Sequence, residues 1–136
     1  MTRTLRLDLN VGTSWSLPES SAGPVGDESA VLAAAAAAGY QGVQGANPRR
    51  CRELGLVATT FAIQPTPGGL GEQAKRWVDR GFACCTVMLG TGREDDVDGA
   101  RLVEEVLDAS VTAGIPLYVE THRATLTQDI WRTVRL

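Results

Sequence analysis

The sequence predicts an α/β fold in which five strands alternate with five helices and form a parallel sheet. Two observations lead to this prediction. Helical stretches end four times at a glycine that is followed by an apolar residue, as in Gly39-Tyr40 and Gly81-Phe82, and glycine is the residue that most often ends a helix. Short apolar runs such as 84–89 follow these glycines, and such runs are typical of strands that are covered on both faces.

Several of the expected strands are short, near-continuous apolar runs. The expected strands are 5–11, 42–45, 57–63, 83–89 and 117–120.

Start and stop signals define the helices between these strands. Asn47 and Pro48 have the types expected for an N-cap and a first helical residue, and Asp95 or Asp96 can cap the next-to-last helix. A capping box at 125–128 predicts the start of the last helix. The expected helices are 27–38, 48–54, 70–81, 95 or 96 to 113, and one that runs from this capping box through Val134.

Apolar residues at helical spacing predict which side of each helix is buried. In the third helix these residues are Leu70, Ala74, Trp77 and Val78. In the fourth helix they are Val97, Ala100, Val103, Val106, Leu107 and Val111.

Composition excludes several classes of protein. The 136 residues, 43% hydrophobic and 21% charged, predict one soluble globular domain over 1–136. A net charge of −3 argues against a nucleic-acid partner, and the apolar run 30–38 is too short to cross a membrane. The N-terminus lacks the apolar region of a signal peptide, and the three cysteines form no paired framework. We therefore expect a cytoplasmic protein.

Five successive βα units fit two architectures. One is an open sheet of the flavodoxin type, with 12–14 as a phosphate-binding loop. The other is an incomplete TIM (β/α)8 barrel made of the first five units. The chain ends inside an amphipathic helix that lacks a glycine stop, which favours the barrel. We therefore expect 1–136 to be a single partial (β/α) barrel domain.

The C-terminal ends of the strands are where parallel α/β folds place their chemistry. The end of the fifth expected strand supplies Glu120, followed by His122 and Arg123. Glu120 and the single histidine of the chain are suited to bind a metal, to transfer protons or to contact a substrate. Alternatively, Glu120 forms an ion pair with Arg123 or another arginine and His122 is a solvated loop residue.

Two segments, 37–44 and 119–129, resemble the xylose isomerase-like TIM barrels, which include sugar phosphate isomerases and epimerases. The resemblance implies a sugar or sugar-like substrate and a divalent cation (Mn, Mg, Co or Zn) at the barrel mouth. It implies that Glu120 is a metal ligand and acid–base residue, and that His122 takes part in catalysis. It also implies that His122 and Arg123 contact the substrate.

The same resemblance implies that the other metal ligands come from strands six to eight. We therefore expect this part of the barrel to hold no metal and to be inactive by itself. The alternative is a non-catalytic partial barrel that acts through self-association, or through a partner, at its open edges.

Three further features have two interpretations each. Trp15 can stack on a sugar ring as a substrate contact, or it can pack against neighbouring side chains. The loop 90–93 can bind an anion through its amides and Arg93, or it can lead into a helix. Cys84 and Cys85 lie within an apolar run and are expected to be inert buried thiols.

Overall fold

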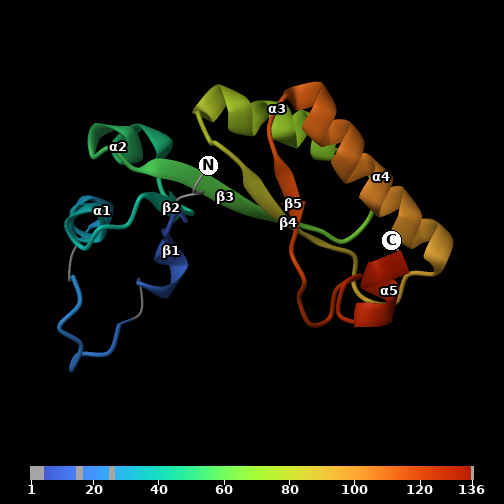
Figure 1. Ribbon diagram of the computed structural model, residues 1–136, viewed down its shortest axis with the longest axis horizontal. Coiled ribbons are helices and arrows are strands. Elements are labelled where there is room, and N and C mark those ends of the chain that lie inside the picture. The colour runs from blue at the N-terminus through green and yellow to red at the C-terminus, as the bar shows by residue number, and fades with distance from the viewer. Residues whose placement is uncertain (1–4, 15–16, 25–26, 136) are drawn as a thin grey trace. The chain divides into compact units, whose positions relative to one another are not determined.

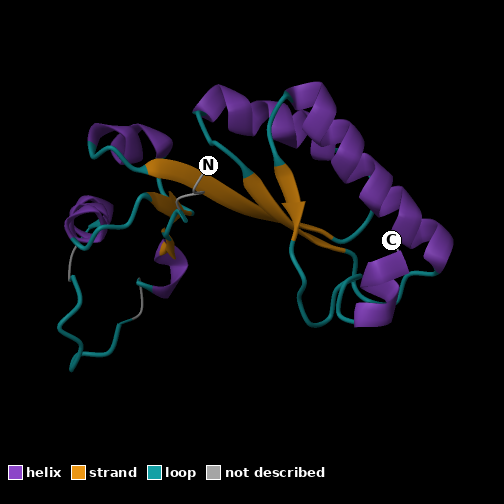
Figure 2. Cartoon of the chain, viewed as in Figure 1, coloured by secondary structure: helices purple, strands orange, loops and turns teal. Residues whose placement is uncertain are grey.

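The structure is a computed structural model that describes residues 5–14, 17–24 and 27–135 (Figures 1 and 2). Strands and helices alternate along this described part, with a short 3₁₀ helix, η1, after the first strand. The elements are β1 (Asp8–Asn10), η1 (Val11–Thr13), α1 (Glu28–Ala37), β2 (Gly42–Gln44), α2 (Pro48–Glu53), β3 (Val57–Gln64), α3 (Leu70–Arg80), β4 (Cys85–Leu89), α4 (Asp96–Ala113), β5 (Leu117–Val119) and α5 (Ile130–Arg135).

The strands are ordered β1-β2-β3-β4-β5, as they occur in the chain. The pairings of β1 with β2, of β2 with β3 and of β4 with β5 are all parallel. This order excludes the flavodoxin type, in which the first strand lies between the second and the third. Successive parallel neighbours joined by helices are the arrangement of an α/β barrel.

The chain divides into two compact units, Met1–Thr60 and Phe61–Leu136. In the first unit, α1 buries Val31 and Leu32. The side chain of Asn47 caps α2 by accepting a hydrogen bond from the amide of Arg49 at 3.0 Å, as the sequence predicts. The carboxylate of Glu28, at the start of α1, accepts a bond from the amide of Asn47 at 2.9 Å, so the two helices of this unit are fixed to one another.

In the second unit, α3 and α4 pack side by side and cover one face of β4 (Figure 1). Trp77 of α3 and Leu102 of α4 are buried, as are Cys85, Val87 and Leu89 of that strand. Gly81 ends α3 and Gly114 ends α4, both in the left-handed conformation that the predicted glycine stops require. No helix in the described ranges is long and apolar enough to cross a membrane.

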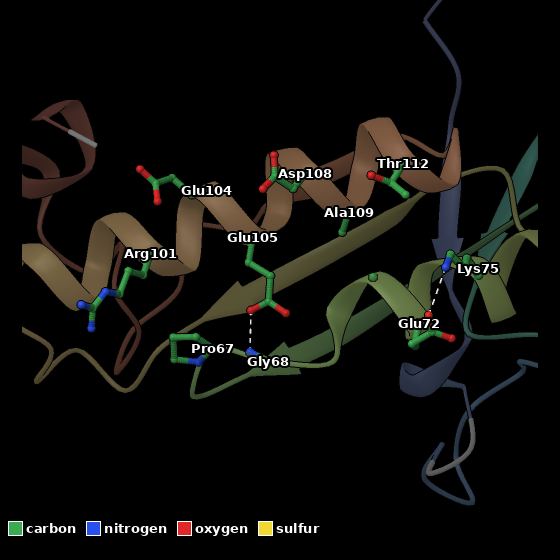
Figure 3. A pocket seen from close by; sticks show the side chains of 11 residues that line it. Pro67, Gly68, Glu72, Lys75, Arg101, Glu104, Glu105, Asp108, Ala109 and Thr112 are labelled. Atoms are coloured by element: carbon green, nitrogen blue, oxygen red, sulfur yellow. Dashed lines mark hydrogen bonds and ion pairs between the residues drawn. The ribbon is translucent and has the colours of Figure 1, made fainter.

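A carboxylate from α4 caps the start of α3. The N-cap residue of α3 is Gly69, which has no side chain to accept the free amides of the first turn. Glu105 accepts hydrogen bonds from the amide of Gly68 at 2.7 Å (Figure 3) and from that of Leu70 at 2.9 Å. Glu105 therefore joins α3 to α4, and it lies in a surface hollow of about 470 Å³ between them.

The first and last elements differ from the predictions. Strand β1 covers 8–10 instead of 5–11, because the side chain of Asn10 accepts a bond from the amide of Gly12 and turns the chain into η1. The predicted capping box at 125–128 is wrong. Asp129 caps α5 instead, since its carboxylate accepts from the amides of Trp131 at 2.7 Å and Arg132 at 3.2 Å.

The predicted buried stripe of α4 is also largely wrong. The buried residues of this helix are Gly99, Leu102, Val106 and Ala109. Of the predicted stripe only Val106 is among them, and Val97, Leu107 and Val111 are 61%, 60% and 84% exposed. The helix thus has apolar residues on two sides, and periodicity alone does not say which side faces the sheet.

Two glycine substitutions should change stability in opposite directions. A Cβ at Gly71 or at Gly114 would meet no atom within 4 Å, but only Gly114 has a positive φ, of 68°. Gly114→Ala should lower the free energy of unfolding by about 1–2 kcal/mol because of the left-handed conformation. Gly71→Ala, inside α3, should raise it by up to about 1 kcal/mol. Urea denaturation of both variants measures this, and equal signs would contradict the analysis.

Candidate functional site

The ends of β3, β4 and β5 form the candidate site in the second unit. The sheet ladder extends past β4 and β5, because the amide of Gly90 donates to Gln64 O at 2.8 Å and that of Glu120 donates to Val87 O at 2.9 Å. The loop after β5 then turns back, and the amide of Leu126 donates to Leu89 O at 2.7 Å. The loops that follow β4 and β5 are therefore adjacent at this edge of the sheet.

Glu94 organises the loop after β4. Its carboxylate accepts hydrogen bonds from the amide and the hydroxyl of Thr91, the latter at 2.7 Å, and from the amide of Gly92 at 2.9 Å. Partial burial raises the pKa of Glu94, but these bonds outweigh that effect and lower it to about 2. The protein's own carboxylate therefore occupies the amides that an external anion would need, and the loop leads into α4 as the alternative interpretation predicts.

Threonine hydroxyls organise the loop after β5. Thr127 donates to Glu120 O at 2.9 Å, and Thr125 donates to His122 O at 2.6 Å. The two hydroxyls also lie 3.2 Å apart, and both side chains are buried. These bonds pair the carbonyls of the strand end, so the path of the chain around Glu120 and His122 is fixed by its own side chains.

Gln128 joins the two loops. Its Oε1 accepts from the amide of Ala124 at 3.1 Å, and its Nε2 donates to Gly92 O at 3.4 Å. A Cβ at Gly92 would lie 2.5 Å from the same Nε2, and the φ of Gly92 is +80°. Glycine is therefore required at position 92 by both the conformation and the close approach of the second loop.

Glu120 follows β5 directly and is half-buried. Side chains alternate along a strand, so Glu120 is on the same side as Tyr118, whose backbone is in register with Thr86. Among the described residues, no hydrogen bond or ion pair engages the Glu120 carboxylate. The alternative interpretation, an ion pair between Glu120 and Arg123, is not observed there.

His122 and Arg123 are exposed in the same loop. The Nδ1 atom of His122 lies 2.7 Å from Arg123 O. A carbonyl oxygen only accepts, so Nδ1 carries the proton and Nε2 of the neutral ring can accept a proton or bind a ligand. In the described part of the chain, no bond joins the side chains of Glu120, His122 and Arg123 to one another. The fourth predicted site residue, Trp15, lies outside the described residues.

The described residues do not fit a divalent cation by themselves. They contain no group of three or more His, Cys, Asp and Glu side chains that could hold a metal ion. A catalytic metal site uses about three protein ligands, and this strand end offers the carboxylate of Glu120 and the ring of His122.

The side of the sheet opposite to α3 and α4 is apolar and open. Phe61 and Ile63 of β3 and Tyr118 of β5 are 47%, 63% and 56% exposed there. In a closed α/β barrel this side faces the interior, where layers of side chains from alternate strands fill it. Glu120 is on this side, at the C-terminal end, where barrel enzymes carry their reactive groups.

Cys85 has no role as a nucleophile at neutral pH. It is completely buried in β4, and burial together with the neighbouring Cys84 raises the pKa of its thiol to about 12. A thiol that stays protonated is unreactive. The prediction of an inert buried thiol is confirmed for Cys85, whereas Cys84 is half-buried.

Comparison with solved structures supports the barrel fold. A chain described as a "xylose isomerase-like TIM barrel/4-hydroxyphenylpyruvate dioxygenase fusion protein" matches with a TM-score of 0.60 and 19% identity, over 98% of this chain and 25% of that chain. This chain thus spans about a quarter of the length of that one. No protein-family model and no curated protein matches this chain. Together with the strand order, the likeness identifies the fold as an incomplete α/β barrel.

Two residues that shape this edge were not singled out from the sequence. For Glu94 a signal was present, because Thr91 and Glu94 have the T-x-x-E spacing of a capping box. The carboxylate does reach back to the amide of Thr91, as in that motif. For Gln128 the sequence suggested only the start of a helix. No local pattern indicates its hydrogen bond to Gly92, which is 36 residues away in the chain.

The bonds of Glu94 make stability depend on pH. The pKa of about 2 is below the ordinary value of 4.5, so the ionised form stabilises the fold fully above pH 4.5, and this contribution is lost as the pH falls from about 4.5 to about 2. Glu94→Gln should lower the free energy of unfolding at pH 7 by about 1–3 kcal/mol, since it weakens charge-assisted bonds. Near pH 2 the variant and the native chain should have nearly equal stability.

Denaturation by urea at pH 7, 4 and 2.5 measures this difference. Glu53→Gln is the matched control, because Glu53 is exposed on α2 and should show almost no difference at any of these pH values. A difference for Glu94→Gln that is independent of pH would show that the carboxylate charge does not stabilise the loop.

Proposed function

We propose that this chain forms the first five βα units of an isomerase or epimerase that moves a proton on a sugar or sugar-like substrate. Its Glu120 is then the carboxylate that this part of the barrel contributes to the reaction. The fold supports the proposal, as does the description of the solved chain as a xylose isomerase-like TIM barrel. The resemblance of segments 37–44 and 119–129 to the same class supports it from the sequence.

The observation that carries the proposal is the state of the Glu120 carboxylate. It is half-buried at the end of β5, and no partner engages it among the described residues. The carboxylate of Glu94, in the loop after the neighbouring strand, accepts three hydrogen bonds from Thr91 and Gly92. A partly desolvated carboxylate without a partner is costly for folding alone, so Glu120 is the one of the two that remains available to a substrate.

Glu120 can act as a general base at this position. It would take a proton from the carbon next to the sugar carbonyl and return it to the carbonyl carbon for isomerisation. For epimerisation, a second acid on the other face of the substrate would return a proton to the same carbon. His122 has Nε2 free to exchange a proton with a sugar hydroxyl. The guanidinium of Arg123 would hold a phosphate or hydroxyl group of the substrate.

A divalent cation (Mn, Mg, Co or Zn) belongs to the proposal only for the complete barrel. Glu120 and His122 are too few ligands to hold one, so the remaining ligands must come from outside the described residues. When bound, such a cation polarises a sugar carbonyl. We propose accordingly that the 136-residue chain alone neither binds such a cation tightly nor catalyses isomerisation.

A second candidate is a non-catalytic partial barrel that associates with another chain. The open apolar side of the sheet, with Phe61, Ile63 and Tyr118 exposed, favours it. The two candidates differ in one respect, because only the first assigns a chemical role to Glu120.

Hydrogen exchange on ketoses tests the role of Glu120. The protein is recovered from its natural source, its intact mass is compared with that of the 136-residue chain, and the same full-length form is prepared with Glu120→Gln. Each is incubated in D₂O with a panel of ketoses and ketose phosphates, and proton NMR follows deuterium at the carbon beside the carbonyl. The variant should incorporate deuterium at least about 100-fold more slowly, which is the usual contribution of a general base.

Glu53→Gln, an exposed carboxylate on α2, is the control and should exchange at the native rate. Circular dichroism confirms that both variants are folded. Native exchange in Glu120→Gln would remove Glu120 from the chemistry. A native protein that exchanges no ketose of the panel would overturn the isomerase proposal and leave the association candidate.

A further inference from the structure

A chain of hydrogen bonds connects the side chain of Gln128 to the ring of His122. The Nδ1 atom of His122 donates to Arg123 O at 2.7 Å, and the amide of Ala124 donates to Gln128 Oε1 at 3.1 Å. The carbonyl of Arg123 and the amide of Ala124 belong to one planar trans peptide group, in which they point in opposite directions. The ring of His122 and the side chain of Gln128 therefore bind the two ends of the same peptide group.

The bonds of this chain all run in one direction. The Nε2 atom of Gln128 donates to Gly92 O at 3.4 Å, so each group donates toward the loop after β4. Gly92 is fixed in that loop by Glu94, whose carboxylate accepts from its amide at 2.9 Å. Hydrogen bonds aligned in this way polarise one another. The bonds of Gln128 therefore strengthen the bond that the ring of His122 makes at the other end.

The peptide group between Arg123 and Ala124 needs contacts that hold it in place. Ala124 has a φ of 57°, and in the described part of the chain it is the one residue other than glycine with a positive φ. This conformation costs free energy for a residue with a Cβ, and it persists where the surrounding contacts determine it. The Oε1 atom of Gln128 supplies such a contact. Without it, the peptide group is freer to rotate and to turn Arg123 O away from the ring.

The position of the proton decides what the ring of His122 can do. In a neutral imidazole one nitrogen donates and the other accepts. Without a partner the ring exchanges between its two neutral forms, so one form predominates only where a hydrogen bond selects it. With the proton on Nδ1, the lone pair of Nε2 remains available to a proton of the substrate.

We propose that Gln128 is a positioning residue that holds the neutral ring of His122 in its Nδ1–H form through the peptide group between Arg123 and Ala124. Gln128 acts through His122 and has no reaction of its own. The proposal rests on the proposed function for the use of Nε2, which would accept a proton from a sugar hydroxyl. It concerns which ring nitrogen carries the proton, and not the charge of the ring.

Nitrogen NMR of His122 tests this role. His122 is the single histidine of the 136-residue chain, so a long-range ¹H–¹⁵N correlation spectrum of the labelled, untagged chain contains one imidazole. In mildly alkaline buffer, the ¹⁵N shifts of its two nitrogens give the ratio of the two neutral forms. The Nδ1–H form should predominate in the native chain. Gln128→Ala should shift the ratio about fivefold toward the Nε2–H form, which is the size expected for the loss of one hydrogen bond.

Two further variants separate this role from a general effect on the fold. Gln128→Glu keeps an oxygen that accepts from the amide of Ala124 and should retain the native ratio. Gln73→Ala is the matched control, because Gln73 lies on α3, outside both loops, and it should also leave the ratio unchanged. Circular dichroism of each variant shows whether the fold is kept.

Three outcomes would overturn the proposal. In the first, the native chain carries the proton of His122 mainly on Nε2. In the second, Gln128→Ala has the native ratio. In the third, Gln128→Ala and Gln73→Ala shift the ratio equally, which would show a general effect.

The result does not depend on the test of the proposed function, because the spectrum is recorded without a substrate. If no ketose exchanges, a shifted ratio in Gln128→Ala still establishes that Gln128 sets the form of His122. If Gln128→Ala has the native ratio, the role of Glu120 is unaffected.

Discussion

The candidate site is shaped by one constraint, that the backbone groups at the ends of parallel strands must find partners once the ladder stops. In the second unit, side chains from the loops themselves meet this constraint. Glu94 takes the amides of Thr91 and Gly92, while Thr125 and Thr127 take the carbonyls of the other loop. Because these loops are closed by their own polar groups, Glu120 differs from Glu94 at the neighbouring strand end, since its carboxylate has no partner among the described residues.

Local rules predicted those parts of the fold that are themselves local. Asn47 and Pro48 start α2, and Gly81 and Gly114 end their helices as predicted, because a cap depends on residues within one turn. The cap of α3 was not predictable in this way. It comes from Glu105, 35 residues from Leu70, and only the packing of α3 on α4 brings the two together.

For the candidate site, the structure bears out the predicted position of Glu120 and does not test its role. Alternation of strands and helices placed Glu120 correctly at the end of β5, since that position follows from where an apolar run stops. Whether Glu120, His122 and Arg123 act together depends on the geometry of the loop after β5. The alternation of strands and helices in the sequence does not predict that geometry. The segment 125–127 shows why the loop geometry could not be predicted. Thr125 has the position of an N-cap, yet its hydroxyl bonds to His122 O, and the helix begins after Asp129 instead.

The two exposed apolar surfaces of the second unit have different physical causes. Phe61, Ile63 and Tyr118 lie on the side of the sheet that a closed barrel fills with side chains from its other strands. Closure of the barrel would therefore bury them. The second surface, on α4, includes Leu107, which lines the hollow that α4 forms with Arg132 and Arg135 of the six-residue helix α5. The exposure of Leu107 therefore depends on how α5 covers α4 and not on closure of the sheet.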